Sequence, residues 1–209
     1  MLLDPRKSEL YRRLQEEEHF HTMNALKCAL IVAIAQNGLE VNVEHPFTLA
    51  SGEISPFYFD LKKVMMMPEA NALTAKLILE RIKDSNINCI GGMESGALPI
   101  TAGIFLEAER SGLAMNWLSV LKTMDERGQW LDGYFNPGDS VGVIEDVAST
   151  GAAALQACER ITGSGLKVVR VFSVLNRGEG VKERIESLGI QYDCLLSHHD
   201  FEALLPVMN

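Results

Sequence analysis

Two adjacent carboxylates and a turn of small, hydroxylated residues stand together at one place in the chain. Glu145 and Asp146 directly follow the apolar run of residues 141–144. The turn of residues 147–151 comes next and leads into an alanine-rich segment that begins at Ala152. Carboxylates are strong acceptors for paired hydroxyl donors, and the amides at the start of a helix favour a phosphate group. This order of residues therefore predicts a seat for a ribose 5-phosphate.

The turn offers several ways to bind the phosphate. Its backbone amides lie at a predicted helix N-terminus, Ser149 or Thr150 can donate further hydrogen bonds, and Gly151 lets the backbone come close to the ligand. A solvated acidic pair followed by an ordinary helix N-cap is the simpler alternative. The complete order of apolar strand, two acids, turn and helix is more specific, and it favours ligand binding. The residues predicted to bind the ligand are Glu145, Asp146, Val147, Ala148, Ser149, Thr150 and Gly151.

This order of residues resembles the phosphoribosyl pyrophosphate (PRPP) signature of the type I phosphoribosyltransferases. Other segments, in the same chain order, are similar to the orotate phosphoribosyltransferases within that family. These segments are residues 47–60, residues 92–99, Leu121-Lys122 with Gly128, Gly138-Asp139, and Asn176-Arg177 with Gly180. The resemblance covers about residues 47–196, and it favours the orotate branch over enzymes that use purines.

The resemblance implies that the protein transfers the phosphoribosyl group of PRPP to orotate in pyrimidine biosynthesis, with release of pyrophosphate. Bond breaking at the anomeric carbon builds positive charge on the ribose and negative charge on the pyrophosphate. The resemblance assigns Asp146 to the ribose and Lys122 to the leaving group, and Mg²⁺ would arrive largely with PRPP. Further PRPP-binding candidates, in a loop whose amides would face the pyrophosphate, are Glu94, Ser95 and Gly96.

The orotate base needs contacts of its own. Arg177 resembles the family residue near the base, where it would partner the orotate carboxylate. Phe57 and Tyr58 belong to the similar N-terminal segment and complete the predicted base-binding residues. Lys62 falls where the family has a basic residue, and it is a further candidate for a substrate contact or for a structural role.

The mobile catalytic loop departs from the family pattern. The family commonly has a second lysine and a histidine where this chain has Asp125 and Arg127. An acid at this place opposes the stabilisation of pyrophosphate, and Arg127 is the cation that could offset it, so Arg127 is included among the predicted catalytic residues. Two alternatives stay open at this point: a noncatalytic relative that binds PRPP or a nucleotide, and a phosphoribosyltransferase for another base.

The elements that must position these residues alternate in type beyond Pro68. Helical patterns at residues 69–83, 98–110, 151–162 and 179–188 are interleaved with strand patterns at residues 88–91, 116–120, 141–144, 166–175 and 191–196. Such alternation predicts an α/β fold with a mainly parallel sheet, helices on both faces, and ligands beyond the carboxyl ends of the strands.

The chain is predicted to form one compact domain with a small N-terminal hood. Residues 1–67 would supply helices at residues 8–18 and 23–36 and a hairpin within residues 47–60. Residues 68–209 would form the phosphoribosyltransferase core.

The composition and the net charge limit the kinds of partner that the protein could bind. The 209 residues are 47% hydrophobic and 22% charged, which is typical of a soluble globular protein. A net charge of −9 argues against a nucleic-acid or anionic-membrane partner. The longest apolar stretch near the N-terminus, residues 28–35, is too short to span a bilayer. The cysteines are widely scattered, as expected of reduced thiols in a cytoplasmic protein; they are Cys28, Cys89, Cys158 and Cys194.

No metal site made of protein side chains is predicted. His198 and His199 lack a third ligand at metal spacing, and His19 and His21 lie on a polar predicted helix. The resemblance implies a homodimer, because in the family the mobile loop serves the site of the neighbouring subunit.

Overall fold

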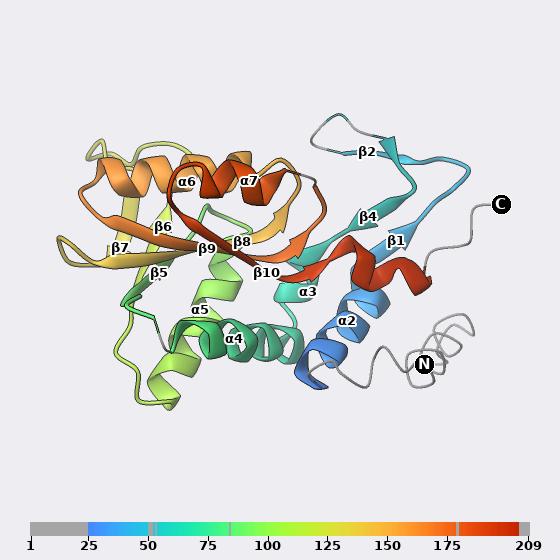
Figure 1. The fold of residues 1–209 in the computed structure, drawn as a ribbon, viewed down its shortest axis with the longest axis horizontal. Helices are drawn as coiled ribbons and strands as arrows, with labels where there is room; N and C mark the ends of the chain where they lie inside the picture. The colour runs from blue at the N-terminus through green and yellow to red at the C-terminus, as the bar shows by residue number, and fades with distance from the viewer. Residues whose placement is uncertain (1–24, 50–51, 53, 84, 179, 205–209) are drawn as a thin grey trace.

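The computed structural model describes residues 25–49, 52, 54–83, 85–178 and 180–204, and a six-stranded sheet forms its centre (Figure 1). The strands of this sheet are β5 (Cys89–Gly91), β6 (Asn116–Val120), β7 (Leu131–Tyr134), β8 (Ser140–Ala148), β9 (Lys167–Asn176) and β10 (Gln191–Ser197). They lie in the order β10-β9-β8-β5-β6-β7, and all neighbours are parallel except β6 and β7, which are antiparallel. The predicted mainly parallel sheet is confirmed.

Helices cover both faces of the sheet, as predicted (Figure 1). One face is covered by α2 (Ala25–Asn37), α3 (Leu61–Met65), α4 (Pro68–Ile82) and α5 (Ala97–Arg110). The other face is covered by α6 (Ala152–Gly163) and α7 (Val181–Glu186). The chain continues from β10 into the 3₁₀ helix η2 (His198–Leu204). Two groups of buried apolar side chains fill the two interfaces.

The inner strands explain why the sheet forms where it does. β8 and β9 each contain four β-branched residues, which pack well on a pleated surface. Val143 and Val171 are fully buried on the side of α6, and Ile144 and Val174 are fully buried on the side of α4 and α5. Burial on both faces is typical of central parallel strands.

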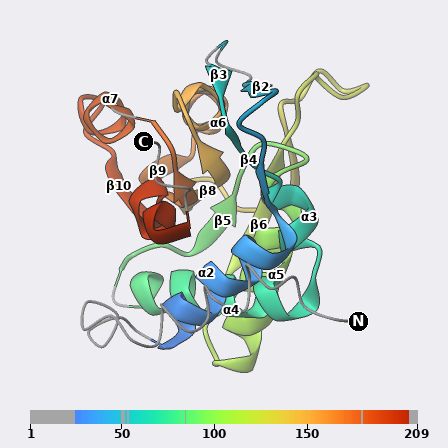
Figure 2. The same cartoon turned by 90° about the vertical axis from the view of Figure 1, so that its right-hand side faces the viewer.

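A small N-terminal hood is built from short antiparallel pairs. The pairs are β1 (Leu39–Val41) with β4 (Phe57–Phe59), and β2 (Phe47–Thr48) with β3 (Ile54–Ser55). The second pair is the hairpin predicted within residues 47–60. In the view of Figure 2 the hood strands stand above α2. Leu30, Ile31 and Ile34 of α2 are buried in the same group as α4 and α5, so this helix packs with the core.

Two strand assignments differ from the sequence-based expectation. No strand is predicted between residues 120 and 141, but β7 lies there; only Leu131 of this edge strand is buried, so it carries almost no hydrophobic signal. β8 continues to Ala148, because Ala148 pairs with Asn176 of β9. The two carboxylates of β8 therefore lie within the strand, and the turn begins later than predicted.

The remaining comparisons with the sequence-based expectations concern helices. The helix predicted at residues 23–36 is present as α2, and the helix predicted at residues 8–18 lies outside the described residues. α3 was not predicted; the carboxylate of Asp60 caps it by accepting the Lys63 amide at 3.1 Å. None of the helices in the described part of the chain is long and apolar enough to cross a membrane.

Candidate functional site

The loop of residues 92–96 brings the first of the predicted site residues together. It joins β5 to α5 and lies against β8. A Cβ atom at Gly96 would lie 2.6 Å from Oδ2 of Asp146, so the carboxylate of Asp146 rests directly on this loop. Ser95 is exposed beside the buried Gly96. The predicted pyrophosphate loop and one of the two predicted ribose ligands are therefore neighbours.

Glu145 has a different environment from Asp146. Its side chain is half-buried, and burial, with the neighbouring charge of Asp146, raises its pKa to about 8. The ammonium of Lys62 on α3 acts in the opposite direction and lowers this pKa. Lys62 therefore lies near enough to interact electrostatically with the acidic pair, which fits its prediction as a substrate or structural residue.

The turn after β8 has the shape expected of an anion-binding helix start. Gly151 is the N-cap of α6 with φ +75°, a left-handed conformation that glycine adopts without strain. The Thr150 hydroxyl accepts a hydrogen bond from the Ala152 amide at 3.3 Å. Ser149 is half-buried and Thr150 is exposed. Amides at the N-terminus of a helix, with its positive dipole end, suit a phosphate group.

The segment that follows β9 supports this turn from the side. The Arg177 amide donates to the Ala148 carbonyl at 2.9 Å, and the Ala148 side chain is buried. A Cβ atom at Gly178 would collide with the carbonyl oxygen of Ser149. Val147 is half-buried and packs against the core on the side of α4 and α5. Val147 and Ala148 thus hold the turn in place through packing and backbone contacts.

Arg177 reaches from the end of β9 to the hood. Its Nη2 atom lies 3.4 Å from the Ser55 hydroxyl and 3.4 Å from the Phe57 carbonyl oxygen. Its guanidinium carbon lies 5.3 Å from the centroid of the Phe59 ring. The structure brings Arg177 and Phe57 together, as a shared base-binding role requires. Ser55 and Phe59 were missed from the sequence, although they alternate with Tyr58 along the hood.

Tyr58 is placed differently from Phe57. It is exposed, and its ring lies 5.6 Å from that of Phe47. Successive side chains of a strand point to opposite faces. Tyr58 therefore faces away from the side of β4 that carries Phe57 and Phe59.

Glu94 joins the pyrophosphate loop to the predicted catalytic loop. Its carboxylate accepts the Lys122 amide at 2.6 Å, and its own amide donates to the Val120 carbonyl at 3.0 Å. The Lys122 side chain is exposed. The structure therefore brings Glu94 and Lys122 together through the main chain, while the ammonium of Lys122 extends into solvent.

Arg127 is engaged within its own loop. Its Nε atom lies 2.7 Å from Oδ2 of Asp125, and its Nη2 atom lies 3.8 Å from Oδ1 of Asp132. The Gln129 amide and Arg127 both donate to Asp125, which lowers the pKa of that carboxyl. Asp125 thus organises the tip of the loop, and the charge of Arg127 is shared with two carboxylates.

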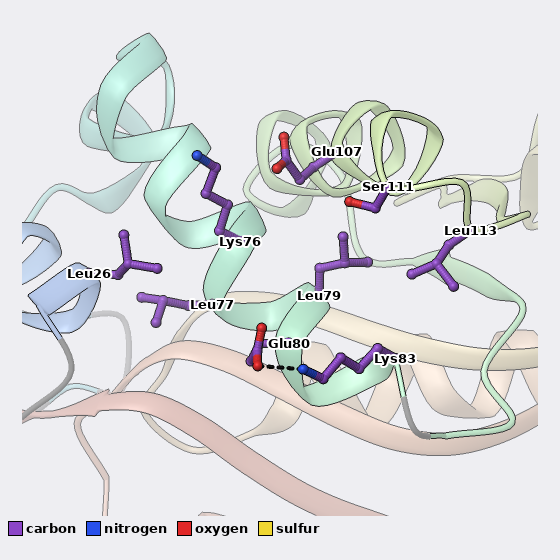
Figure 3. A pocket seen from close by; sticks show the side chains of 9 residues that line it. All are labelled: Leu26, Lys76, Leu77, Leu79, Glu80, Lys83, Glu107, Ser111 and Leu113. Carbon is purple, nitrogen blue, oxygen red and sulfur yellow. Dashed lines mark hydrogen bonds and ion pairs between the residues drawn. The ribbon is translucent and has the colours of Figure 1, made fainter.

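One cavity of the molecule lies away from these residues. A pocket of about 280 Å³ lies between α4 and α5. Figure 3 shows the side chains that line it, with Leu26 of α2 at its side. Its lining includes Leu77 and Leu113 together with charged side chains such as Lys76. None of the predicted site residues lines it. The candidate site is instead the edge of the sheet where β5, β6, β8 and β9 end.

Known proteins resemble the chain over most of its length. It is 36% identical over 159 residues to the orotate phosphoribosyltransferase of Aquifex aeolicus, covering 75% of this chain and 87% of that protein. It is 36% identical over 162 residues to the orotate phosphoribosyltransferase of Pyrococcus furiosus, covering 75% and 86%. A crystal structure of Mycobacterium tuberculosis orotate phosphoribosyltransferase in complex with PRPP matches with a TM-score of 0.70 and 28% identity, over 84% of this chain and 98% of that one.

The chain matches none of the models of known protein families. The relatives nevertheless align with its sequence over three quarters of its length, and the solved structure has a similar fold. The predicted PRPP-binding segments meet at one edge of that fold, where Asp146 lies on the loop of residues 92–96. The chain therefore belongs to the orotate phosphoribosyltransferase family.

Proposed function

We propose that the protein transfers the phosphoribosyl group of PRPP to orotate and forms orotidine 5′-monophosphate and pyrophosphate. The observation that carries this proposal is the convergence of three segments at the carboxyl edge of the sheet. The carboxylate of Asp146 lies on the loop of residues 92–96, and the turn that starts α6 is supported by the segment of Arg177. The relatives named orotate phosphoribosyltransferase, and the related structure that holds PRPP, support the same reaction.

The arrangement suits a displacement at the anomeric carbon of the ribose. The amides around Ser149 to Gly151 would bind the 5-phosphate, and Glu145 and Asp146 would hold the ribose hydroxyls. A ring nitrogen of orotate gives up its proton to the solvent and forms the new bond to the anomeric carbon, and the pyrophosphate leaves with the electron pair of the broken bond. Positive charge then develops on the ribose beside the Asp146 carboxylate, and negative charge develops on pyrophosphate near Lys122.

Arg177 is the proposed partner of the orotate carboxylate. Its contacts with the Ser55 hydroxyl and the Phe57 carbonyl oxygen are both 3.4 Å long, which is long for hydrogen bonds. A carboxylate that binds a guanidinium through two shorter, charge-assisted bonds would replace them with a gain in free energy. Phe57 would then lie beside the base, and Tyr58, which lies on the opposite face of β4, is left out of this contact.

Magnesium would enter the site with PRPP. Within the described residues no group of three His, Cys, Asp or Glu side chains is arranged to hold a metal ion. The donor present is the Asp146 carboxylate beside the loop of residues 92–96, and one carboxylate with substrate phosphates is a common way to hold Mg²⁺. Bound Mg²⁺ would neutralise part of the charge that develops on pyrophosphate.

The assembly and the compartment complete the proposal. The protein would work as a homodimer in which the loop of one subunit reaches the site of the other, as the family resemblance implies. It would work in the cytoplasm, where its cysteines, all free thiols, stay reduced. Light scattering tests the assembly, because an active protein that is only monomeric at assay concentration contradicts it.

One assay tests the reaction itself. The purified protein is incubated with PRPP, orotate and Mg²⁺, and orotidine 5′-monophosphate is measured by chromatography. Adenine, hypoxanthine and uracil replace orotate in parallel reactions. Product with another base but not with orotate would identify a phosphoribosyltransferase of different specificity. PRPP binding by calorimetry without product from any base would identify a noncatalytic PRPP-binding relative.

A further inference from the structure

We propose that Arg160 is a positioning residue that fixes the main chain of Lys122 in the proposed reaction. Arg160 lies near the end of α6, and its side chain is half-buried. Its Nη1 atom donates to the Leu121 carbonyl, and its Nη2 atom lies 3.5 Å from the Lys122 carbonyl oxygen. Its guanidinium carbon lies 3.9 Å from the centroid of the Trp130 ring. The guanidinium therefore contacts both ends of the loop that joins β6 to β7.

Lys122 and its predecessor are held at every main-chain polar group. The Leu121 amide donates to the Trp130 carbonyl at 2.9 Å, and the Lys122 amide donates to Glu94 at 2.6 Å. Arg160 donates to the Leu121 carbonyl, and its other terminal nitrogen approaches the Lys122 carbonyl oxygen at 3.5 Å. These contacts restrain the main chain from which the exposed Lys122 side chain extends.

Arg160 also links the elements that would grip opposite ends of PRPP. It belongs to α6, whose first turn is the proposed phosphate site. Its Nη1 atom lies 3.7 Å from the sulfur of Met93, which belongs to the proposed pyrophosphate loop. The main chain of Lys122 is thus fixed relative to α6 and to the loop of residues 92–96 by Arg160 and by Glu94.

The chemistry of the guanidinium explains why this residue is an arginine. Its planar fork can donate to two carbonyls at once while its face stacks on an indole ring. A lysine at the same place is a compact ammonium that cannot maintain both contacts and the stacking. The inference rests on the proposed transfer reaction, because Lys122 is assigned there to the leaving pyrophosphate.

Steady-state kinetics test the positioning role. For Arg160→Met we expect kcat to fall between about tenfold and a hundredfold, because a small misplacement of a catalytic group has effects of this size. The KM for PRPP should change by less than about threefold, since the seat on β8 and α6 remains. Arg160→Lys should restore little of the loss. Arg110→Met is the matched control, because it removes an exposed arginine at the far end of α5 and should leave kcat unchanged.

Limited proteolysis tests the same role without the reaction. Trypsin cleavage after Lys122 needs the local opening that Arg160 opposes. In Arg160→Met and Arg160→Lys, mass spectrometry should show faster cleavage after Lys122 relative to cleavage after Arg127 in the same loop. Equal cleavage ratios in wild type and both variants, or a full kcat in Arg160→Met, would overturn the proposal. If wild type forms no orotidine 5′-monophosphate, the proposed function fails, and the cleavage ratio alone decides the placement of Lys122.

Discussion

Glu145 and Asp146 are neighbours in β8, but the surroundings of their carboxyl groups differ. Asp146 lies against the loop of residues 92–96, where a carboxylate can face both the ribose and the amides of the loop. Glu145 is half-buried, and its pKa is raised to about 8 by burial and by the charge of Asp146. Glu145 is therefore largely protonated near neutral pH. The protonated carboxyl group of Glu145 could therefore donate a hydrogen bond to a ribose hydroxyl and also accept one. The Asp146 carboxylate could only accept, and it lies beside the loop of residues 92–96.

Replacing Asp146 tests the ribose contact. Asp146→Asn keeps the shape of the side chain but removes its charge, so the ribose hydroxyls lose a charged acceptor. We expect the affinity for PRPP to fall by at least about tenfold, the effect of losing a hydrogen bond to a charged group. Calorimetry at fixed Mg²⁺ measures this change. Glu159→Gln, at an exposed residue of α6, is the control; equal PRPP affinities for wild type and Asp146→Asn would remove Asp146 from the seat.

Glu145 makes the stability of the fold depend on pH. Its pKa in the folded protein is about 8 and its ordinary value is 4.5, so the unfolded chain ionises first as the pH rises. Wild type should therefore lose stability relative to Glu145→Gln between these two values. From pH 4 to pH 9 the difference between the two proteins should shift in favour of the variant by up to about 5 kcal/mol.

Urea unfolding across this pH range measures the effect. Glu159→Gln changes an exposed carboxyl on α6, and its difference from wild type should stay nearly constant with pH. A Glu145→Gln difference that is equally constant would show that Glu145 ionises normally in the folded protein.

At the scale of elements, the turn before α6 and the segment after β9 approach each other at a glycine. Gly178→Ala would place a Cβ atom against the Ser149 carbonyl oxygen. We expect a loss of about 2 kcal/mol in the free energy of unfolding, because the backbone must move, and a weaker affinity for PRPP. Gly163→Ala is the matched control at the last residue of α6, where a Cβ would meet no atom within 4 Å.

The two glycine variants should change stability in opposite directions. Alanine is a better helix former than glycine, so Gly163→Ala should stabilise the protein by up to about 1 kcal/mol. Urea unfolding and PRPP titration of both variants make the comparison. Similar, small effects from both would show that the turn tolerates a side chain at residue 178, against the close approach to Ser149.

The same elements show what a sequence can and cannot predict. The apolar strand, the two acids and the turn follow one another within residues 141–151, so their order alone predicts a PRPP seat there and the helix that follows it. The contact of Arg177 with Ser55 joins residues 122 positions apart, and that of Arg160 with Leu121 joins residues 39 apart. No local pattern encodes such pairs, because they depend on how strands and hood are placed. β7 was not predicted for a different reason: only one of its residues is buried, so its sequence shows no hydrophobic alternation.

At the scale of the whole molecule, the candidate site contains segments from both helical layers. These layers pack on opposite faces of the sheet and have separate hydrophobic cores. The turn after β8 leads into α6, which packs on one face of the sheet. The loop of residues 92–96 leads into α5, which packs on the other face. β8 lies between them and contributes Val143 to one core and Ile144 to the other. A ligand that contacts the turn, the loop and β8 at once would therefore oppose the separation of both layers from the sheet.

Binding of PRPP should consequently stabilise the whole fold in one transition. A ligand at about 100 times its Kd adds about 2.7 kcal/mol to the folded state. For a chain of this size that corresponds to a rise in Tm of roughly 5 to 10 °C. Scanning calorimetry with PRPP and Mg²⁺ measures the shift, and Asp146→Asn should show most of it lost. Ribose 5-phosphate, which lacks the pyrophosphate, should give a smaller rise because it contacts the turn and β8 but leaves the loop of residues 92–96 unoccupied. If ribose 5-phosphate matched PRPP, the loop would add nothing to binding, and the assignment of pyrophosphate to it would fail.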